Sequence, residues 1–402
     1  MRIVFTSVSD QVGGSESMLL QIISELRRVS PSWDLHLVLP GLGPLATRAA
    51  ALGVSIVPLP MPPGLARLGE WGMSSRGKVA VASRLLRAAL ALPGYERRLQ
   101  RVLAEIQPDV IHANGFKAQI VAARAGVGQG GLVWHIHEYV GDRPLTRILV
   151  RRYAGRCRAI VANSESVGDD VRRIVGPRDT VRVILNAVDL EKFSPGGPVA
   201  DLDALSGLPP APDGTVRIGL IATFSRWKGH DTFLRAIAAL SDAARVRGYV
   251  VGGATYDTEG SQYSIEELRR LAASVGLENR VGFTGLAADP ERVMRALDVV
   301  VHASTTPEPF GLVIAEAMAC GRAVITSGTG GAAELVSDGE DAVVHRAGDA
   351  ADLAARMTRL ATDGALRARL GLAARATALK RFDARRLGEE FTATYAAARR
   401  PA

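Results

Sequence analysis

The sequence is poor in cysteine and in long apolar runs, and each shortage excludes a class of protein. Its 402 residues include only two cysteines, Cys157 and Cys320, whose separation fits no metal-ligand spacing and indicates a reducing compartment. No run of about 18 apolar residues occurs, so we expect no membrane-spanning helix. The opening residues Met1–Thr6 are too short an apolar run for a signal peptide and predict a first strand. We therefore expect a cytoplasmic protein.

Acidic residues are scarce in the first half of the chain. Residues 1–190 contain 24 Lys+Arg and 15 Asp+Glu, a net charge of +9, whereas the remainder contains 25 and 26, a net charge of −1. This asymmetry predicts an anionic partner for the first half. A basic nucleic-acid-binding protein is the non-enzyme alternative, but no basic stretch interleaved with aromatics supports it, and we expect no nucleic-acid partner.

Apolar strand-like segments alternate with helical segments in both halves of the chain. Such alternation predicts an α/β fold with parallel sheets and helical crossovers. A stretch dense in Pro, Gly and Asp separates the halves and is typical of a linker. We therefore expect a first domain over 1–190, a linker over 191–214, a second domain over 215–380 and a C-terminal helix over 381–402.

Two glutamates, Glu308 and Glu316, stand eight residues apart in the second half. Pro309 favours an extended Glu308 on a loop at a strand end, and the good helix formers that follow place Glu316 in the second turn of a helix. The N–H groups at the start of that helix form a ready anion site; they belong to Phe310, Gly311, Leu312 and Val313. This arrangement suits a nucleotide sugar, with Glu308 accepting hydrogen bonds from sugar hydroxyls and Glu316 from a ribose diol.

Two further loops carry groups suited to phosphate. Gly13 and Gly14 allow backbone N–H groups to approach an anion closely, although they do not form a G-x-G-x-x-G fingerprint. Lys228 precedes a helix and can neutralise a diphosphate as a point charge.

The segment EPFGLVIAEAMACGRAVI, with Glu308 and Glu316, resembles the E-x7-E motif of the family-four retaining glycosyltransferases. The resemblance implies two Rossmann-like domains facing each other across a cleft (the GT-B arrangement), with a C-terminal helix crossing back to the first domain. It also implies transfer of a sugar, with retention, from a UDP- or GDP-sugar to an acceptor hydroxyl. The expected setting is polysaccharide, glycolipid or glycoconjugate biosynthesis, with a sugar, lipid-linked or small-molecule acceptor.

The same resemblance implies roles for individual residues. The strand-end histidine of the family, which lies beside the donor sugar, corresponds to His137, and its diphosphate lysine corresponds to Lys228. The family arginine stands five residues before the lysine, where this chain has Thr223, so the expected arginine role moves to Arg226. The Gly13-Gly14 loop would face the donor phosphates.

Neither a metal nor another cofactor is expected. Asp201-Leu202-Asp203 has the D-x-D form of a metal-binding dyad, but it lies in the expected linker. Two other enzymes on the same architecture remain open, a nucleotide-sugar 2-epimerase and an inverting transferase. An inverting enzyme would need a strand-end histidine base where this chain has Gly13 and Gly14.

Arginine and leucine are interleaved over residues 65–106, including Arg84, Arg87, Arg97 and Arg98. A helix of this kind can lie on an anionic membrane, which would suit a lipid-linked acceptor and peripheral attachment to the inner face of the membrane. The alternative is a soluble helix whose leucines face the core and whose arginines are solvated.

Overall fold

The structure is a computed structural model that describes residues 1–62, 78–126, 128, 130–241, 244–254 and 260–399, with only the backbone described over 78–89. It divides into two compact units. The first contains Met1–Ala187 and Ala384–Ala402, and the second contains Val188–Asp383. Within the described ranges, no helix is long and apolar enough to cross a membrane.

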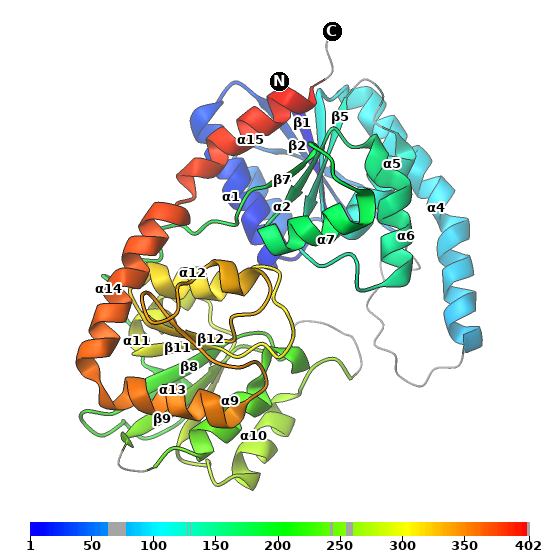
Figure 1. Cartoon of the computed structure of the whole chain (residues 1–402). Helices are drawn as coiled ribbons and strands as arrows, with labels where there is room; N and C mark the ends of the chain where they lie inside the picture. Colours follow the sequence, from blue (N-terminus) through cyan, green and yellow to red (C-terminus); the bar gives the residue numbers. More distant parts are fainter. Residues whose placement is uncertain (63–77, 127, 129, 242–243, 255–259, 400–402) are drawn as a thin grey trace. The chain divides into compact units, whose positions relative to one another are not determined.

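The first unit is built on a seven-stranded parallel sheet with the strand order β3-β2-β1-β4-β5-β6-β7 (Figure 1). Its inner strands are mainly apolar and buried on both faces, the pattern that parallel sheets covered by helices require, whereas the two edge strands are partly exposed. The bounds are β1 (Arg2–Thr6), β2 (Asp34–Leu39), β3 (Ser55–Pro58), β4 (Val110–Asn114), β5 (Gly131–Ile136), β6 (Ala159–Ala162) and β7 (Val181–Val183). The strand order reverses between β1 and β4, and ligands of such sheets bind at the carboxyl ends of the strands near this point.

Helices cover this sheet, and the crossovers between neighbouring strands are helical. They are α1 (Gly14–Val29), α2 (Pro44–Ala51), α4 (Lys78–Ile106), α5 (Phe116–Ala125), α6 (Pro144–Tyr153), the 3₁₀ turn η1 (Ala154–Arg156), α7 (Glu165–Val175) and α15 (Arg385–Ala398). Helix α1 shows why these segments are helical. Its buried residues Met18, Leu19, Ile22, Ile23 and Leu26 recur at helical spacing and face the sheet.

The C-terminal helix α15 completes the core of the first unit. Leu387, Phe391 and Tyr395 are fully buried in the same apolar cluster as β1 and α1. Figure 1 shows α15, in red, beside the blue α1. The prediction of a C-terminal helix that returns to the first domain is confirmed.

The second unit has a six-stranded parallel sheet with the order β10-β9-β8-β11-β12-β13. Its strands are β8 (Val216–Ile221), β9 (Val246–Val251), β10 (Val281–Gly285), β11 (Val299–His302), β12 (Ala323–Thr326) and β13 (Val343–Val344). Its helices are α8 (Leu202–Ser206), η2 (Arg226–Lys228), α9 (His230–Ala238), α10 (Ile265–Ser274), α11 (Pro290–Ala296), α12 (Leu312–Ala319), η4 (Gly331–Glu334), α13 (Ala350–Thr362) and α14 (Gly364–Arg381). Two parallel-sheet α/β domains are therefore present, as predicted.

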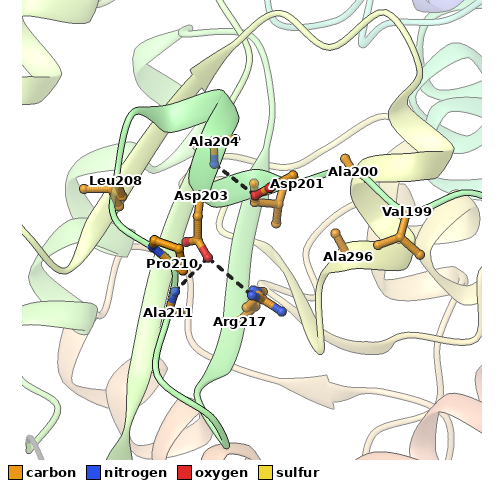
Figure 2. A pocket seen from close by; sticks show the side chains of 11 residues that line it. Val199, Ala200, Asp201, Asp203, Ala204, Leu208, Pro210, Ala211, Arg217 and Ala296 are labelled. Atoms are coloured by element: carbon orange, nitrogen blue, oxygen red, sulfur yellow. Dashed lines mark hydrogen bonds and ion pairs between the residues drawn. The ribbon is translucent and has the colours of Figure 1, made fainter.

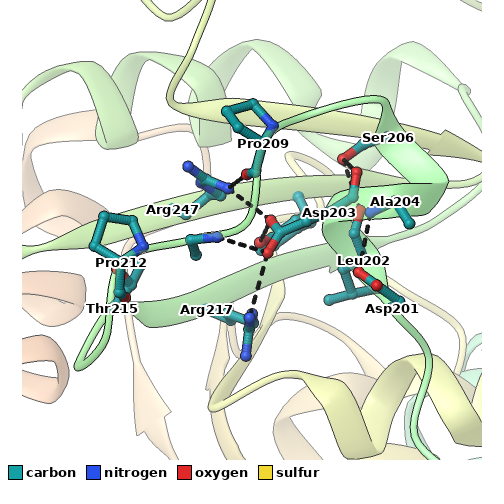
Figure 3. A network of polar contacts seen from close by, with 12 residues as sticks. Asp201, Leu202, Asp203, Ala204, Ser206, Pro209, Pro212, Thr215, Arg217 and Arg247 are labelled. Carbon is teal, nitrogen blue, oxygen red and sulfur yellow. Dashed lines mark hydrogen bonds and ion pairs between the residues drawn. The ribbon is translucent and has the colours of Figure 1, made fainter.

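The segment 191–214 belongs to the second unit, which differs from the prediction of a separate linker. Asp203 on α8 explains the difference (Figure 3). Its Oδ1 accepts hydrogen bonds from Arg247 (2.7 Å) and from the Tyr249 hydroxyl (2.6 Å), both on β9. Its Oδ2 accepts from Arg217 on β8 (3.3 Å). Burial opposes ionisation, but these partners outweigh it and lower the pKa of Asp203 to about 2.

Candidate active site

Glu308 lies at the carboxyl edge of the second sheet, on the loop between β11 and α12. Its backbone N–H donates to the carbonyl of Thr329 (3.3 Å), and its carbonyl accepts from Gly331 N–H (2.7 Å). Both partners follow β12, so the loop is held against the neighbouring strand end. The sequence predicted this position, because Pro309 keeps Glu308 extended and the helix begins only at Leu312.

The Glu308 carboxylate is buried and densely bonded. Its Oε2 accepts from the Lys228 ammonium (2.7 Å) and the Ser304 hydroxyl (2.9 Å), and lies 3.2 Å from His302 Nε2. Burial by itself would raise the pKa of this carboxyl, but the charge of Lys228 and the contact with His302 lower it to about 2. Glu308 is therefore a carboxylate throughout the neutral range.

Lys228 reaches this carboxylate because its turn is fixed to the loop after β11. Gly229 has a φ of 77°, and a Cβ there would overlap the carbonyl oxygen of Ala303, so only glycine fits. Thr305 N–H donates to the carbonyl of Trp227 (2.7 Å), and the Lys228 ammonium lies 4.0 Å from the centre of the Trp227 ring. The turn and the loop are thus held against each other at the carboxyl edge of the sheet.

The guanidinium of Arg226 lies in a different cluster. It donates to the carbonyl of Gly260 (3.0 Å) and to Glu267 (3.1 Å), and it stacks over the ring of Tyr263 at 4.3 Å. These contacts hold Arg226 against the start of α10 instead of beside Lys228. Its place in the sequence could not reveal this, because the partners lie more than 30 residues further along the chain.

Glu316 lies in the second turn of α12, where the sequence placed it, and its side chain is partly buried. Burial raises the pKa of Glu316 to about 8; the charge of Lys192 opposes this rise and that of Glu291 adds to it. At pH 7 the carboxyl is therefore mainly protonated, which the sequence gave no means to predict.

The first turn of α12 contributes through its backbone. The Phe310 side chain is 2% exposed and packs edge-on against Phe382, so it is part of the core. Gly311 adopts a φ of 91°, which turns the chain into the helix that begins at Leu312. The predicted anion site thus rests on the helix N-terminus and its backbone N–H groups.

His137 belongs to the first unit and directly follows β5. Its Nε2 lies 2.8 Å from the Asn114 side-chain oxygen, and its ring packs on that of His135 with centres 4.0 Å apart. Burial lowers the pKa of His137 to about 4, so the imidazole is neutral at pH 7. Because the amide oxygen can only accept, the Nε2 atom carries the proton.

The Gly13-Gly14 loop lies at the start of α1. The Glu16 side chain accepts from Gly13 N–H at 3.2 Å, and a Cβ at Gly14 would meet open space. The Asn114 amide donates to the carbonyl of Ser15 at 3.4 Å. Asn114 therefore contacts both His137 and this loop. The sequence analysis predicted neither this role of Asn114 nor the roles of His302 and Ser304 beside Glu308.

Two cavities within the described residues lie at the amino ends of the strands, the sheet edges opposite to those of Glu308 and His137. One of about 350 Å³ is lined by Val199, Asp201, Asp203 and Arg217 (Figure 2). Arg217 stands near the start of β8, whereas Glu308 follows the end of the parallel strand β11. The other, of about 660 Å³, is lined by Gln107, Asp109 and Arg399, and Asp109 directly precedes β4.

Comparison with known protein families shows to which family the chain belongs. Residues 12–192 match the family described as "Glycosyltransferase Family 4", and residues 215–363 match "Glycosyl transferases group 1". These matches fall on the two units and include the segments of His137, Lys228, Glu308 and Glu316. The fold and both matches define a glycosyltransferase of the GT-B type. The chain belongs to glycosyltransferase family 4, as the sequence indicated.

Among its curated relatives is the D-inositol 3-phosphate glycosyltransferase of Stackebrandtia nassauensis, which is 32% identical over 289 residues. That alignment covers 66% of this chain and 63% of the relative. The corresponding protein of Corynebacterium jeikeium is 31% identical over 218 residues, covering 53% and 51%. The chain thus spans about half to two thirds of the length of these relatives.

Solved structures match over nearly the whole chain. Anabaena HepE in complex with UDP and glucose has a TM-score of 0.80 and 26% identity, covering 98% of this chain and 99% of HepE. Sucrose-phosphate synthase from Thermosynechococcus elongatus, at 21% identity, has a TM-score of 0.77 and covers 98% of each chain, which shows the shared fold. The predicted fold class is confirmed.

Proposed function

We propose that this protein transfers a sugar from a nucleoside diphosphate sugar to an acceptor hydroxyl, with retention at the anomeric carbon. The observation that carries the proposal is the buried Glu308 carboxylate paired with Lys228 beside the N-terminus of α12. This edge offers a cation and backbone N–H groups for a diphosphate and a carboxylate for sugar hydroxyls. UDP is the favoured nucleotide, because HepE, at 26% identity, was solved with UDP; GDP is the alternative.

In the proposed reaction, negative charge develops on the departing diphosphate. Lys228 and the N–H groups of α12 stabilise that charge. Glu308 holds sugar hydroxyls and supports the positive charge of an oxocarbenium-like transition state. The leaving phosphate oxygen takes the acceptor proton, so the reaction needs no side-chain base. The contacts of Arg226 with Glu267 and Tyr263 leave the diphosphate role to Lys228.

Within the first unit, His137 and the Gly13-Gly14 loop are the groups that suit a sugar and a phosphate. His137 is neutral and its Nε2–H is held by Asn114, so this histidine orients the sugar instead of adding charge. The open space beside Gly14 allows backbone N–H groups to approach a phosphate.

Anionic acceptors fit the net charge of +9 over residues 1–190. The curated relatives are named for D-inositol 3-phosphate, and a phosphorylated polyol is such an anion. A lipid-linked acceptor on an anionic membrane fits this positive charge as well.

The segment 65–106 is described only in part, because the arginines at 67, 76, 84 and 87 lie outside the described side chains. Among the leucines of this segment whose side chains are described, Leu99 is buried while Leu90 is 74% exposed. Leu145 and Ile148 on α6, 57% and 62% exposed, add apolar surface beside Arg147 and Arg151.

Co-sedimentation with anionic and neutral vesicles across a salt series tests membrane attachment. Attachment predicts binding to anionic vesicles that fades as salt rises and weakens when Arg97 and Arg98 become glutamine. It also weakens in the Leu145→Ser/Ile148→Ser variant, whereas Leu372→Ser, an exposed leucine of the second unit, serves as the control. Absence of binding at low salt refutes attachment and favours a free acceptor.

The proposed activity is tested with a panel of nucleoside diphosphate sugars, scored by thermal shift and by slow donor hydrolysis. Glu308→Gln and Lys228→Ala should each reduce turnover about 10²–10³-fold without unfolding the protein. Lys380→Ala, on the exposed surface of α14, is the matched control. Near wild-type turnover in both site variants refutes the site.

The same panel separates the remaining alternatives. Inverted product stereochemistry indicates an inverting transferase, and a rearranged donor indicates a 2-epimerase. Salt-sensitive nucleic-acid binding without donor hydrolysis indicates a binding protein. We also propose that no metal is required; activity abolished by EDTA and restored by magnesium or manganese refutes this.

A further inference from the structure

A chain of hydrogen bonds runs behind Glu308 from the end of β12 to its carboxylate. Gly328 N–H donates to Thr326 Oγ1 (3.3 Å), and this hydroxyl lies 3.1 Å from His302 Nδ1. The Ser327 hydroxyl also approaches Nδ1 at 3.5 Å. Because the ionised Glu308 carboxylate can only accept, His302 Nε2 carries the proton and donates to it at 3.2 Å, and Nδ1 of the neutral ring accepts from the Thr326 hydroxyl.

The backbone fixes this chain in place. His302 and Thr326 are directly paired in the parallel ladder between β11 and β12. The buried hydroxyl of Ser304, two residues further along, donates to the same Glu308 oxygen at 2.9 Å and lies 3.0 Å from His302 Nε2. His302 is 4% exposed, and Ser304 and Thr326 are fully buried. These donors are therefore held independently of any ligand.

Lys228 differs from these donors because the Glu308 carboxylate and the proposed donor diphosphate would compete for its ammonium. Its ammonium pairs with Glu308 at 2.7 Å, yet its side chain is 19% exposed, more than those of His302 and Glu308. The proposed function also requires Lys228 to meet the donor diphosphate. A diphosphate carries more charge than one carboxylate, so it competes strongly for this single ammonium.

We propose that His302 and Ser304 are positioning residues that keep Glu308 ionised and oriented when the donor diphosphate draws on the Lys228 ammonium. This inference rests on the proposed function. Without the two donors, Glu308 would be a buried carboxylate with a weakened counter-ion beside an anion, and protonation would become favourable. The groups facing Glu308 that can titrate are Lys228 and His302, with His345 behind the backbone of His302.

The test compares variants that remove or restore the N–H donor. His302→Leu removes it, His302→Gln places an amide N–H near the position of Nε2, and Ser304→Ala removes the hydroxyl. His345→Gln is the matched control, because His345 is also buried and contacts only the carbonyl of His302 among these residues. Thr326→Val, which removes the hydroxyl that holds the tautomer, replaces His302→Leu if that variant fails to fold.

The first measurement is the dependence of kcat and KM on pH. The wild type should show no loss of kcat from the protonation of Glu308 between pH 8 and pH 5. His302→Leu and Ser304→Ala should lose at least tenfold in kcat over that range, with a smaller change in KM for the donor. His302→Gln should restore the wild-type profile, and His345→Gln should keep it even if the protein is less stable.

The second measurement is calorimetric and does not depend on turnover. On binding UDP near pH 6, His302→Leu should take up as much as one proton more than the wild type, as its Glu308 becomes protonated. Profiles and proton uptake that match the wild type overturn the inference while leaving the proposed function intact. A wild type that neither binds UDP nor depends on Glu308 overturns both.

Discussion

Glu316 makes the protein sensitive to pH in a direction that can be measured. Its carboxyl has a pKa near 8 in the folded protein because burial disfavours the charge, compared with about 4.5 when unfolded. Each pKa unit corresponds to about 1.4 kcal/mol, so keeping the ionised form buried costs on the order of 5 kcal/mol. The stability that the folded protein gains by holding the neutral Glu316 carboxyl is fully present below about pH 4.5, and it is lost as the pH rises toward and above 8.

Glu316→Gln removes the charge while keeping the shape of the side chain. Urea unfolding of both proteins between pH 5 and pH 9 should show the variant gaining stability relative to the wild type as the pH rises, by a few kcal/mol at pH 9. Glu340→Gln, which changes an exposed glutamate in the same unit, is the control and should track the wild type.

Nucleotide binding tests the protonation state of the Glu316 carboxyl independently. If Glu316 accepts hydrogen bonds from the ribose diol as a carboxylate, binding of UDP near pH 7 should release up to one proton. Calorimetry in two buffers with different ionisation enthalpies measures that proton. A stability difference between the wild type and Glu316→Gln that stays constant from pH 5 to pH 9 would show that the buried-carboxyl reasoning is wrong.

Three further variants test the packing. Gly229→Ala should destabilise the protein by at least about 2 kcal/mol, because the positive φ and the neighbouring carbonyl leave no room for a Cβ; Gly94→Ala, in an open part of α4, should be neutral or stabilising in the same thermal assay. Asp203→Ala should cost about 3–5 kcal/mol in urea unfolding, since it leaves a buried arginine without its counter-ion. Tyr395→Phe should cost about 1–3 kcal/mol by removing the 2.7 Å partner of the buried His112; an unchanged unfolding midpoint in either of these two variants would contradict the reasoning.

The sequence was most informative where local chemistry decides the structure. The alternation of buried strands and amphipathic helices predicted both parallel sheets. Pro309 and the helix formers after it placed Glu308 and Glu316 correctly on a loop and in a second helical turn. These features depend on residues only a few positions apart, so they can be read directly from the chain.

Distant partners decided the features that the sequence did not predict. The composition of 191–214 is typical of a linker, yet Asp203 is bonded to Arg247, which lies 44 residues further along the chain. The direction of Arg226 depends on Glu267, 41 residues away. The protonation of Glu316 depends on burial produced by the whole second unit. No local pattern contains this information.

The return of α15 to the first unit has a consequence for synthesis on the ribosome. Translation proceeds from the N-terminus, so all residues of Val188–Asp383 are made before α15 appears. The second unit can therefore fold as soon as its own chain is complete, whereas the first unit must wait with the places of Phe391 and Tyr395 unfilled. Of the two units, the first begins to be synthesised before the second and is completed after it. Until then, the apolar surface of α1 and β1 is open to chaperones and to aggregation.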